Sequence, residues 1–225
     1  MTTKIIVSNG VKKWLVGLLG LIVAVGPFLL AQQPHQLPFA SKDNIIELSI
    51  QNSSSVSVSR VKVEATIVPS WIRFASNEQS ITQLKGRESA TAAFSFFIDK
   101  TAPVNKPQTL TFTITGSTGE NWTKQISIAV NPPDHFELFQ NYPNPFNPTT
   151  TISYQLPSDV NVVLKIFNSI GQEVTTLVDE VRSAGYHQEL WNAPSVASGM
   201  YIYQLTMGNE QGKKEFFRKK MMLLK

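Results

Sequence analysis

Thr109-Leu-Thr-Phe-Thr-Ile-Thr115 alternates polar and apolar side chains with a period of two. Because successive side chains of a β-strand point to opposite faces, Leu110, Phe112 and Ile114 share one face and the threonines share the other. This pattern predicts a strand with one buried face and one face in water.

The same alternation surrounds this stretch on both sides. Val61, Val63, Ala65 and Ile67 form one apolar row, and Phe94, Phe96 and Ile98 form another. Further strands are expected at Ile45–Gln51, Trp71–Phe74, Ser80–Leu84 and Ile126–Val130. Short strands at such spacing predict a β-sandwich over residues 43–131.

Asn131-Pro132-Pro133-Asp134 interrupts the alternation. Proline donates no backbone hydrogen bond and restricts the residue before it, so we expect a proline linker over 132–135. The alternative is a kinked crossover inside one larger domain, but about 90 residues on each side are enough for a separate core.

Residues 136–225 repeat the alternation with a different sequence. The expected strands are Thr149–Leu156, Val162–Ile166, Glu173–Val178, Tyr186–Trp191, Met200–Met207 and Glu215–Leu224. Gly171, Gly185 and the stretch Asn209–Gly212 have the residues that favour turns. A second β-sandwich is predicted.

The first 31 residues have the pattern of a secretory signal peptide. Lys12-Lys13 precede an apolar run that begins at Trp14, and a small residue, Ala31, comes before polar residues. Cleavage near Ala31 would leave residues 32–42 as a linker. The alternative is a retained membrane anchor over Trp14–Ala31.

Composition excludes several classes of function. The chain has 225 residues and no cysteine, so thiol chemistry and zinc–thiolate sites are excluded. Three histidines provide little material for a metal site, and no cofactor or metal is expected. Without the three lysines of residues 1–31, the 20 basic residues become 17 against 16 acidic ones, which argues against nucleic-acid binding. No catalytic motif is present, and we expect no enzyme.

The second domain resembles a known family in the order of its motifs. These begin with Phe136-Glu-Leu-Phe-Gln-Asn-Tyr-Pro-Asn-Pro-Phe-Asn-Pro-Thr-Thr-Thr-Ile152 and continue through Leu164-Lys-Ile-Phe-Asn168, Ala184-Gly-Tyr-His187, Ser198-Gly-Met-Tyr-Ile-Tyr-Gln-Leu205 and Lys219-Lys-Met-Met-Leu-Leu-Lys225. The stretch resembles the type A C-terminal sorting domain of the type IX secretion system.

This resemblance implies a set of sorting-motif residues, namely Pro143, Asn144, Pro145, Gly185, Gly199, Tyr201, Tyr203, Lys219, Lys220 and Lys225. It implies recognition by an outer-membrane translocon and an associated sortase, after entry through the Sec translocon. Attachment to a surface glycan or lipopolysaccharide is a further implied step, and the destination is the cell surface or the medium by way of the periplasm.

The first domain resembles the immunoglobulin-like β domains that precede such tails. The predicted fold is therefore all-β, with two tandem immunoglobulin-like sandwiches after a signal peptide. We expect the first domain to be a structural or adhesive module. The alternative is a secreted carbohydrate-binding module in which Trp71, Phe74, Phe97 and Trp122 supply stacking faces. A hydrolase is a third, weaker reading.

Overall fold

The structure is a computed structural model that describes residues 5–12 (backbone only), 33–117, 119–208 and 214–225. Every regular element in these ranges is a strand, so the predicted all-β fold is confirmed. None of the described segments forms a membrane-length apolar helix. Contacts divide the chain into unit 1 (1–99 and 105–131) and unit 2 (100–104 and 132–225).

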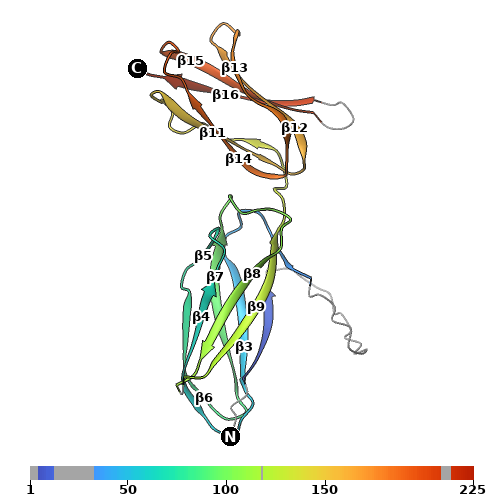
Figure 1. Cartoon of the computed structure of the whole chain (residues 1–225), viewed down its shortest axis with the longest axis vertical. Coiled ribbons are helices and arrows are strands. Elements are labelled where there is room, and N and C mark those ends of the chain that lie inside the picture. Colours follow the sequence, from blue (N-terminus) through green and yellow to red (C-terminus); the bar gives the residue numbers. More distant parts are fainter. Residues whose placement is uncertain (1–4, 13–32, 118, 209–213) are drawn as a thin grey trace. The chain divides into compact units, whose positions relative to one another are not determined.

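Unit 1 consists of two sheets, drawn in blue to green in Figure 1. Its strands are β1 (Ile5–Lys12), β2 (His35–Leu37), β3 (Asn44–Asn52), β4 (Val58–Ile67), β5 (Ile72–Phe74), β6 (Glu78–Leu84), β7 (Ser89–Ile98), β8 (Gln108–Thr115) and β9 (Asn121–Val130). One sheet has the order β1-β3-β7-β5 and the other β2-β9-β8-β4-β6.

The alternating apolar residues of the two sheets form the core of unit 1. Leu110, Phe112 and Ile114 are all completely buried, as their period predicts. Phe94 of β7 and Phe112 of β8 meet with ring centroids 5.0 Å apart, which joins one sheet to the other. This arrangement is a β-sandwich.

One predicted core position in β4 is wrong. Ile67 was expected on the same face as Val61, Val63 and Ala65, but its side chain is 61% exposed. The pairing of β4 with β8 shifts register between Ala65 and Ile67, and this bulge turns Ile67 to the outside. The extra residue is Thr66, whose hydroxyl donates to the carbonyl of Thr111 at 3.3 Å.

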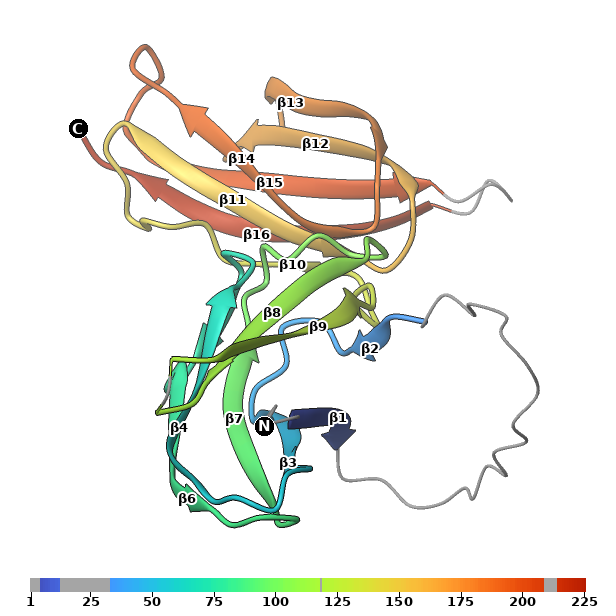
Figure 2. The ribbon, with the colours of Figure 1, turned by 60° about the horizontal axis from the view of Figure 1, so that its bottom comes forward.

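Unit 2 is a second two-sheet structure. Its strands are β10 (Glu137–Leu138), β11 (Thr149–Leu156), β12 (Val160–Asn168), β13 (Glu173–Arg182), β14 (Gly185–Asn192), β15 (Gly199–Gly208) and β16 (Lys214–Leu223). The sheet orders are β10-β11-β14 and β13-β12-β15-β16. Figure 2 shows β15 and β16 running beside each other in red.

The core of unit 2 is built from the predicted rows. Ile152, Tyr154 and Leu156 of β11 are completely buried, as are Tyr203 and Leu205 of β15. The aromatic row of β15 is therefore part of the core, as its period predicts.

Two N-terminal strands lie in segments where the alternation predicts none. Residues 35–37 of the expected linker form β2, which pairs in parallel with β9 and buries Leu37. Ile5–Lys12, inside the expected signal peptide, forms β1 and pairs with β3. The predicted apolar run from Trp14 to Ala31 and the predicted turn at 209–212 lie outside the described residues.

Candidate functional site

The last strand of the chain is covered along one edge by the proline-rich segment before β11. Phe146 donates its N–H to the carbonyl of Met222 at 2.9 Å, and Leu224 donates its N–H to the carbonyl of Phe146 at 3.0 Å. The side chain of Asn144 accepts the N–H of Met222 at 2.9 Å. We call the backbone groups of Lys220, Met222 and Leu224 the C-terminal edge.

Gln140 extends this cover by one step. Its side-chain amide donates to the carbonyl of Lys220 at 2.8 Å. Residues 140–146 therefore bond the C-terminal edge from Lys220 to Leu224, and an edge so covered cannot add another strand there.

The hydroxyl of Tyr203, on the core side, holds the start of the covering segment, residues 140–146. This hydroxyl accepts the N–H of Asn141 and donates to the carbonyl of Phe139, with both distances 2.9 Å. The ring is completely buried, and burial raises the pKa of Tyr203 to about 12. The hydroxyl thus stays protonated at ordinary pH and can act as donor and acceptor at once.

Asn141 and Thr150 complete the support. The side-chain amide of Asn141 donates to the hydroxyl of Thr150 at 2.9 Å and to the carbonyl of Pro143 at 3.0 Å. The Thr150 hydroxyl donates to the same carbonyl at 2.8 Å. Both residues are at most 2% exposed, so these bonds replace lost water.

These two residues and Gln140 were not among the predicted site residues. A signal was present for Thr150, because it lies two residues before Ile152 and so faces the core. Nothing in the alternation marks Gln140 or Asn141, because their partners lie elsewhere in the chain.

The C-terminal residue is also held. Lys225 donates its N–H to the hydroxyl of Ser198 at 3.1 Å, and its ammonium group donates to the carbonyl of Pro194 at 2.8 Å. Gly199, with φ of +153°, follows this loop and begins β15 opposite Leu223. The predicted residues Pro143, Asn144, Pro145, Gly199 and Lys225 therefore lie around the ends of β15 and β16.

Lys219 and Lys220 point to opposite faces of β16. Lys219 pairs with Tyr203, shares the core-facing side with Met221 and is half-buried, whereas Lys220 pairs with Ile202 on the outer face and is exposed. Strand alternation requires this separation. The two lysines cannot form a single basic patch.

Two predicted residues have other surroundings. Tyr201 is buried and its hydroxyl donates to the carbonyl of Ala197 at 2.7 Å. Gly185 starts β14 opposite Leu156 with φ of +125°, a backbone conformation that favours glycine. Gly185 therefore has a structural reason to be glycine that is separate from the C-terminal edge.

His187, on the same strand as Gly185, is held by packing. Its ring stacks on Tyr154 with centroids 5.2 Å apart, and Nε2 lies 2.8 Å from the carbonyl oxygen of Ser183.

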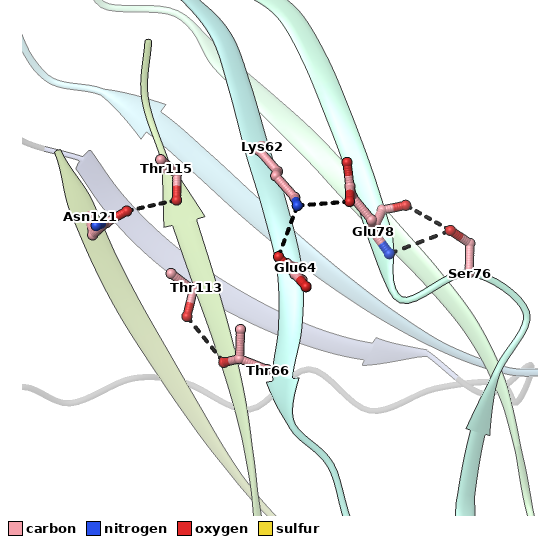
Figure 3. Close-up of polar contacts among 8 residues, drawn as sticks. All are labelled: Lys62, Glu64, Thr66, Ser76, Glu78, Thr113, Thr115 and Asn121. Carbon is pink, nitrogen blue, oxygen red and sulfur yellow. Dashed lines mark hydrogen bonds and ion pairs between the residues drawn. The ribbon is translucent and has the colours of Figure 1, made fainter. Parts of the chain in front are cut away.

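The outer face of unit 1 is polar and bonded within itself (Figure 3). Lys62 lies 2.9 Å from the carboxylates of both Glu64 and Glu78, and hydrogen bonds to these two raise its pKa. Between β4 and the neighbouring β8, the hydroxyls of Thr66 and Thr113 are 3.0 Å apart, and the hydroxyl of Thr115 on β8 donates to the side chain of Asn121 at 2.7 Å. Such a face suits contact with water.

The aromatic residues considered for carbohydrate binding differ in exposure, and Trp122 is half-buried on β9. Trp71 is only 7% exposed. Phe74 packs on Phe96 with centroids 5.5 Å apart and on other rings of the core. Phe97 is 44% exposed and lines a shallow pocket of about 510 Å³ with Lys42 and Asp43.

Within the described ranges no three His, Asp or Glu side chains gather as metal ligands would.

The family comparison covers the covering segment and most strands of unit 2, and its matched range ends just before the C-terminal edge. Residues 140–219 match the family model described as a secretion system C-terminal sorting domain. The matched range begins at Gln140, the first residue of the covering segment, and ends inside β16. A comparison with curated proteins found no match.

Three solved structures share a distant likeness. Dimeric latent PorU from Porphyromonas gingivalis is 14% identical with a TM-score of 0.35, and the match covers 88% of this chain and 19% of that chain. The YadV chaperone is 8% identical with a TM-score of 0.30, and the match covers 84% of this chain and 98% of that chain. The secreted serine protease VesC from Vibrio cholerae is 11% identical with a TM-score of 0.30, and the match covers 72% of this chain and 46% of that chain. The chain thus spans about a fifth of the PorU chain.

Unit 2 is accordingly an all-β sorting domain whose last strand is secured by the segment that opens the domain. It belongs to the C-terminal sorting domains of the type IX secretion system.

Proposed function

We propose that this chain is exported to the cell surface or the medium by type IX secretion, with unit 2 as the sorting signal. Unit 1 is then the cargo, a non-catalytic immunoglobulin-like module with a structural or adhesive role. The observation that carries the proposal is the family match over residues 140–219, which lies wholly within unit 2.

The route begins with the Sec translocon, which reads the signal peptide of residues 1–31. After cleavage near Ala31, the chain folds in the periplasm and meets the outer-membrane translocon. An associated sortase then cuts near 131–135 and joins the cargo to a surface glycan or lipopolysaccharide, or releases it. Asn131, Asp134 and His135 are exposed, and the segment contains no strand, so a cut there leaves the core of each unit intact.

The translocon recognises side chains of β16 and not its backbone at the C-terminal edge, because those backbone groups are already hydrogen-bonded to residues 140–146. The outer face of β16 presents Phe216, Arg218, Lys220 and Met222, all exposed. It combines two cations with two large apolar side chains. A surface of this kind suits a partner with an acidic and apolar groove.

The carbohydrate-binding alternative for unit 1 has less support. Stacking on a sugar needs an exposed aromatic face, and Trp71 and Phe74 use their faces in packing. A structural or adhesive role requires no such platform and agrees with the polar outer face around Lys62.

A reporter fusion tests the sorting role. A periplasmic reporter carrying residues 132–225 at its C-terminus is expected outside the cell in a host with the pathway. The same reporter carrying residues 43–131 is the control and should stay in the periplasm. Periplasmic retention of both fusions, with unit 2 folded, would reject the proposal.

A charge-reversal variant tests the recognition surface in the full chain. Arg218→Glu with Lys220→Glu is expected to block export without loss of folding, because both side chains are exposed. Lys106→Glu, an exposed position in unit 1, is the matched control and should leave export unchanged. Normal export of the double variant would exclude this surface.

A further inference from the structure

The outer edge of β3 is covered by a segment that the mature protein is expected to lose. β1 pairs antiparallel with β3 over eight residues, from Ile5 opposite Asn52 to Lys12 opposite Ile45 (Figure 2). The whole of β1 lies within residues 1–31. Signal-peptide cleavage therefore removes one strand of the sheet and exposes the outer edge of β3.

The exposed edge would be able to accept a strand. β3 contains no proline, lysine or arginine between Asn44 and Asn52, and its pairing with β7 has no bulge. These are the features with which proteins usually block an edge. At the other edge of the same sheet β5 has only three residues, which limits pairing there.

The hydrogen bonds of Asn52, at the end of β3, show which backbone groups of β3 point toward β7 and which point toward β1. Asn52 donates its N–H to the carbonyl of Glu88 and accepts the N–H of Arg87, so its backbone groups face the β7 side. Because these directions alternate along a strand, the groups of Ile46, Leu48 and Ile50 face β7 as well. Those of Ile45, Glu47, Ser49 and Gln51 face β1 and become free on cleavage.

We propose that cleavage of the N-terminal segment lets the β3 edges of two copies of this chain pair antiparallel, so that the mature protein is a two-fold dimer. This inference rests on the signal-peptide cleavage that the proposed function includes. In a chain that keeps residues 1–31, β1 occupies this edge of β3.

A two-fold axis at Leu48 gives a self-complementary register. Ile46 then faces Ile50 of the other copy on the buried side, and Leu48 faces Leu48, so the apolar row of the core continues across the interface. On the outer side Glu47 faces Ser49, and Ile45 faces Gln51. An axis at Glu47 would instead set two carboxylates against each other, which disfavours that register.

The same register sets the outward backbone N–H and C=O groups of one copy opposite those of the other copy. Glu47 and Ser49 both direct their backbone groups outward, and they are directly opposite each other in the dimer. Each such pair exchanges two N–H to carbonyl bonds, as in any antiparallel ladder. No other strand of the chain is needed to complete the sheet.

The test measures the N-terminus and the oligomeric state of the processed full chain together. Mass spectrometry should place the N-terminus near residue 32, and light scattering after size exclusion should give a dimer. Ser49→Pro removes one outward N–H while leaving the bonds to β7, and it should weaken dimerisation by roughly tenfold or more. Ser49→Ala retains the N–H and should dimerise like the unmodified chain.

Cross-linking tests the register without relying on the proline variant. The chain has no native cysteine, so Glu47→Cys and Ser49→Cys chains each carry a single thiol. When the two are mixed and oxidised, the mixed disulfide should form faster than either disulfide between identical chains, because positions 47 and 49 face each other across the dimer.

The outcomes separate this inference from the export proposal. A retained N-terminus overturns both, since β1 then still covers β3. A processed chain that is monomeric, or that shows no preference for the mixed disulfide, overturns the dimer and leaves the export proposal standing. A processed dimer with that preference supports the inference.

Discussion

Replacing Tyr203 by phenylalanine tests whether one hydroxyl holds the covering segment on the sorting domain. The hydroxyl accepts the N–H of Asn141 and donates to the carbonyl of Phe139, both at 2.9 Å. Tyr203→Phe keeps the ring in the core but leaves that donor and that acceptor without their partner. Asn141 is only 2% exposed, so water cannot fully replace the lost bond.

The expected loss of unfolding free energy is about 2 kcal/mol, within the range of about 1–3 kcal/mol for an orphaned buried group. For a unit of this size it corresponds to a fall in melting temperature of about 10 °C. Calorimetry of the full chain measures it, and the transition of unit 1 serves as the internal reference.

Tyr201→Phe is the matched control for this experiment. The Tyr201 hydroxyl donates a single bond, to the carbonyl of Ala197, and accepts no backbone N–H. A smaller loss, about 1 kcal/mol, is therefore expected. Equal losses in the two variants, or a change below about 0.5 kcal/mol in Tyr203→Phe, would refute the reasoning.

The same tyrosine predicts how stability changes at alkaline pH. Burial raises the pKa of Tyr203 from 10.0 to about 12. In the unfolded chain the hydroxyl loses its proton near pH 10, whereas in the folded chain it keeps the proton until about pH 12. The stabilisation that comes from the raised pKa of Tyr203 is fully present below pH 10 and is lost as the pH rises to 12. Tyr203→Phe should therefore reduce the fall in unfolding free energy between pH 10 and pH 12.

Three further predictions concern other parts of the molecule. Asn144→Ala removes the acceptor of the Met222 N–H, so the amide of Met222 should exchange its hydrogen faster. The amides of β12 should keep their protection. Unchanged exchange at Met222 would contradict the covering role of Asn144. Ile114→Ala leaves a cavity in the core of unit 1 and should cost about 2–5 kcal/mol in denaturant unfolding of that unit, against less than about 0.5 kcal/mol for Thr113→Ala. The Asp134 carboxylate, which accepts a hydrogen bond from Nδ1 of His135, raises the pKa of His135 above its usual value. Asp134→Asn should therefore lower the midpoint of the His135 NMR titration, and an unmoved midpoint would exclude that pairing.

Period-two alternation predicts the parts of the fold that local sequence determines. The faces of β8 and β15 follow directly, because Leu110, Phe112 and Ile114, like Tyr203 and Leu205, point inward on regular strands. The alternation fails at Ile67 because a bulge at Thr66 resets the phase, and a bulge with no glycine or proline leaves no sequence signal.

The sorting-domain residues were found by resemblance, but their arrangement was not predicted. Asn144 and Met222 are 78 positions apart, and periodicity within a strand contains no information on which loop covers which edge. Short strands such as β2 and β10, of three and two residues, show no alternation long enough to detect. Long-range contacts of this kind depend on the tertiary fold.

Export of the unmodified chain tests the central claim most directly. The fraction of the chain outside the cell is measured in a host with the type IX pathway and in the same host lacking the outer-membrane translocon. We predict that the chain is found outside only when the translocon is present, and that it accumulates in the periplasm, cleaved near Ala31, when the translocon is absent. Equal amounts outside both strains would contradict the account.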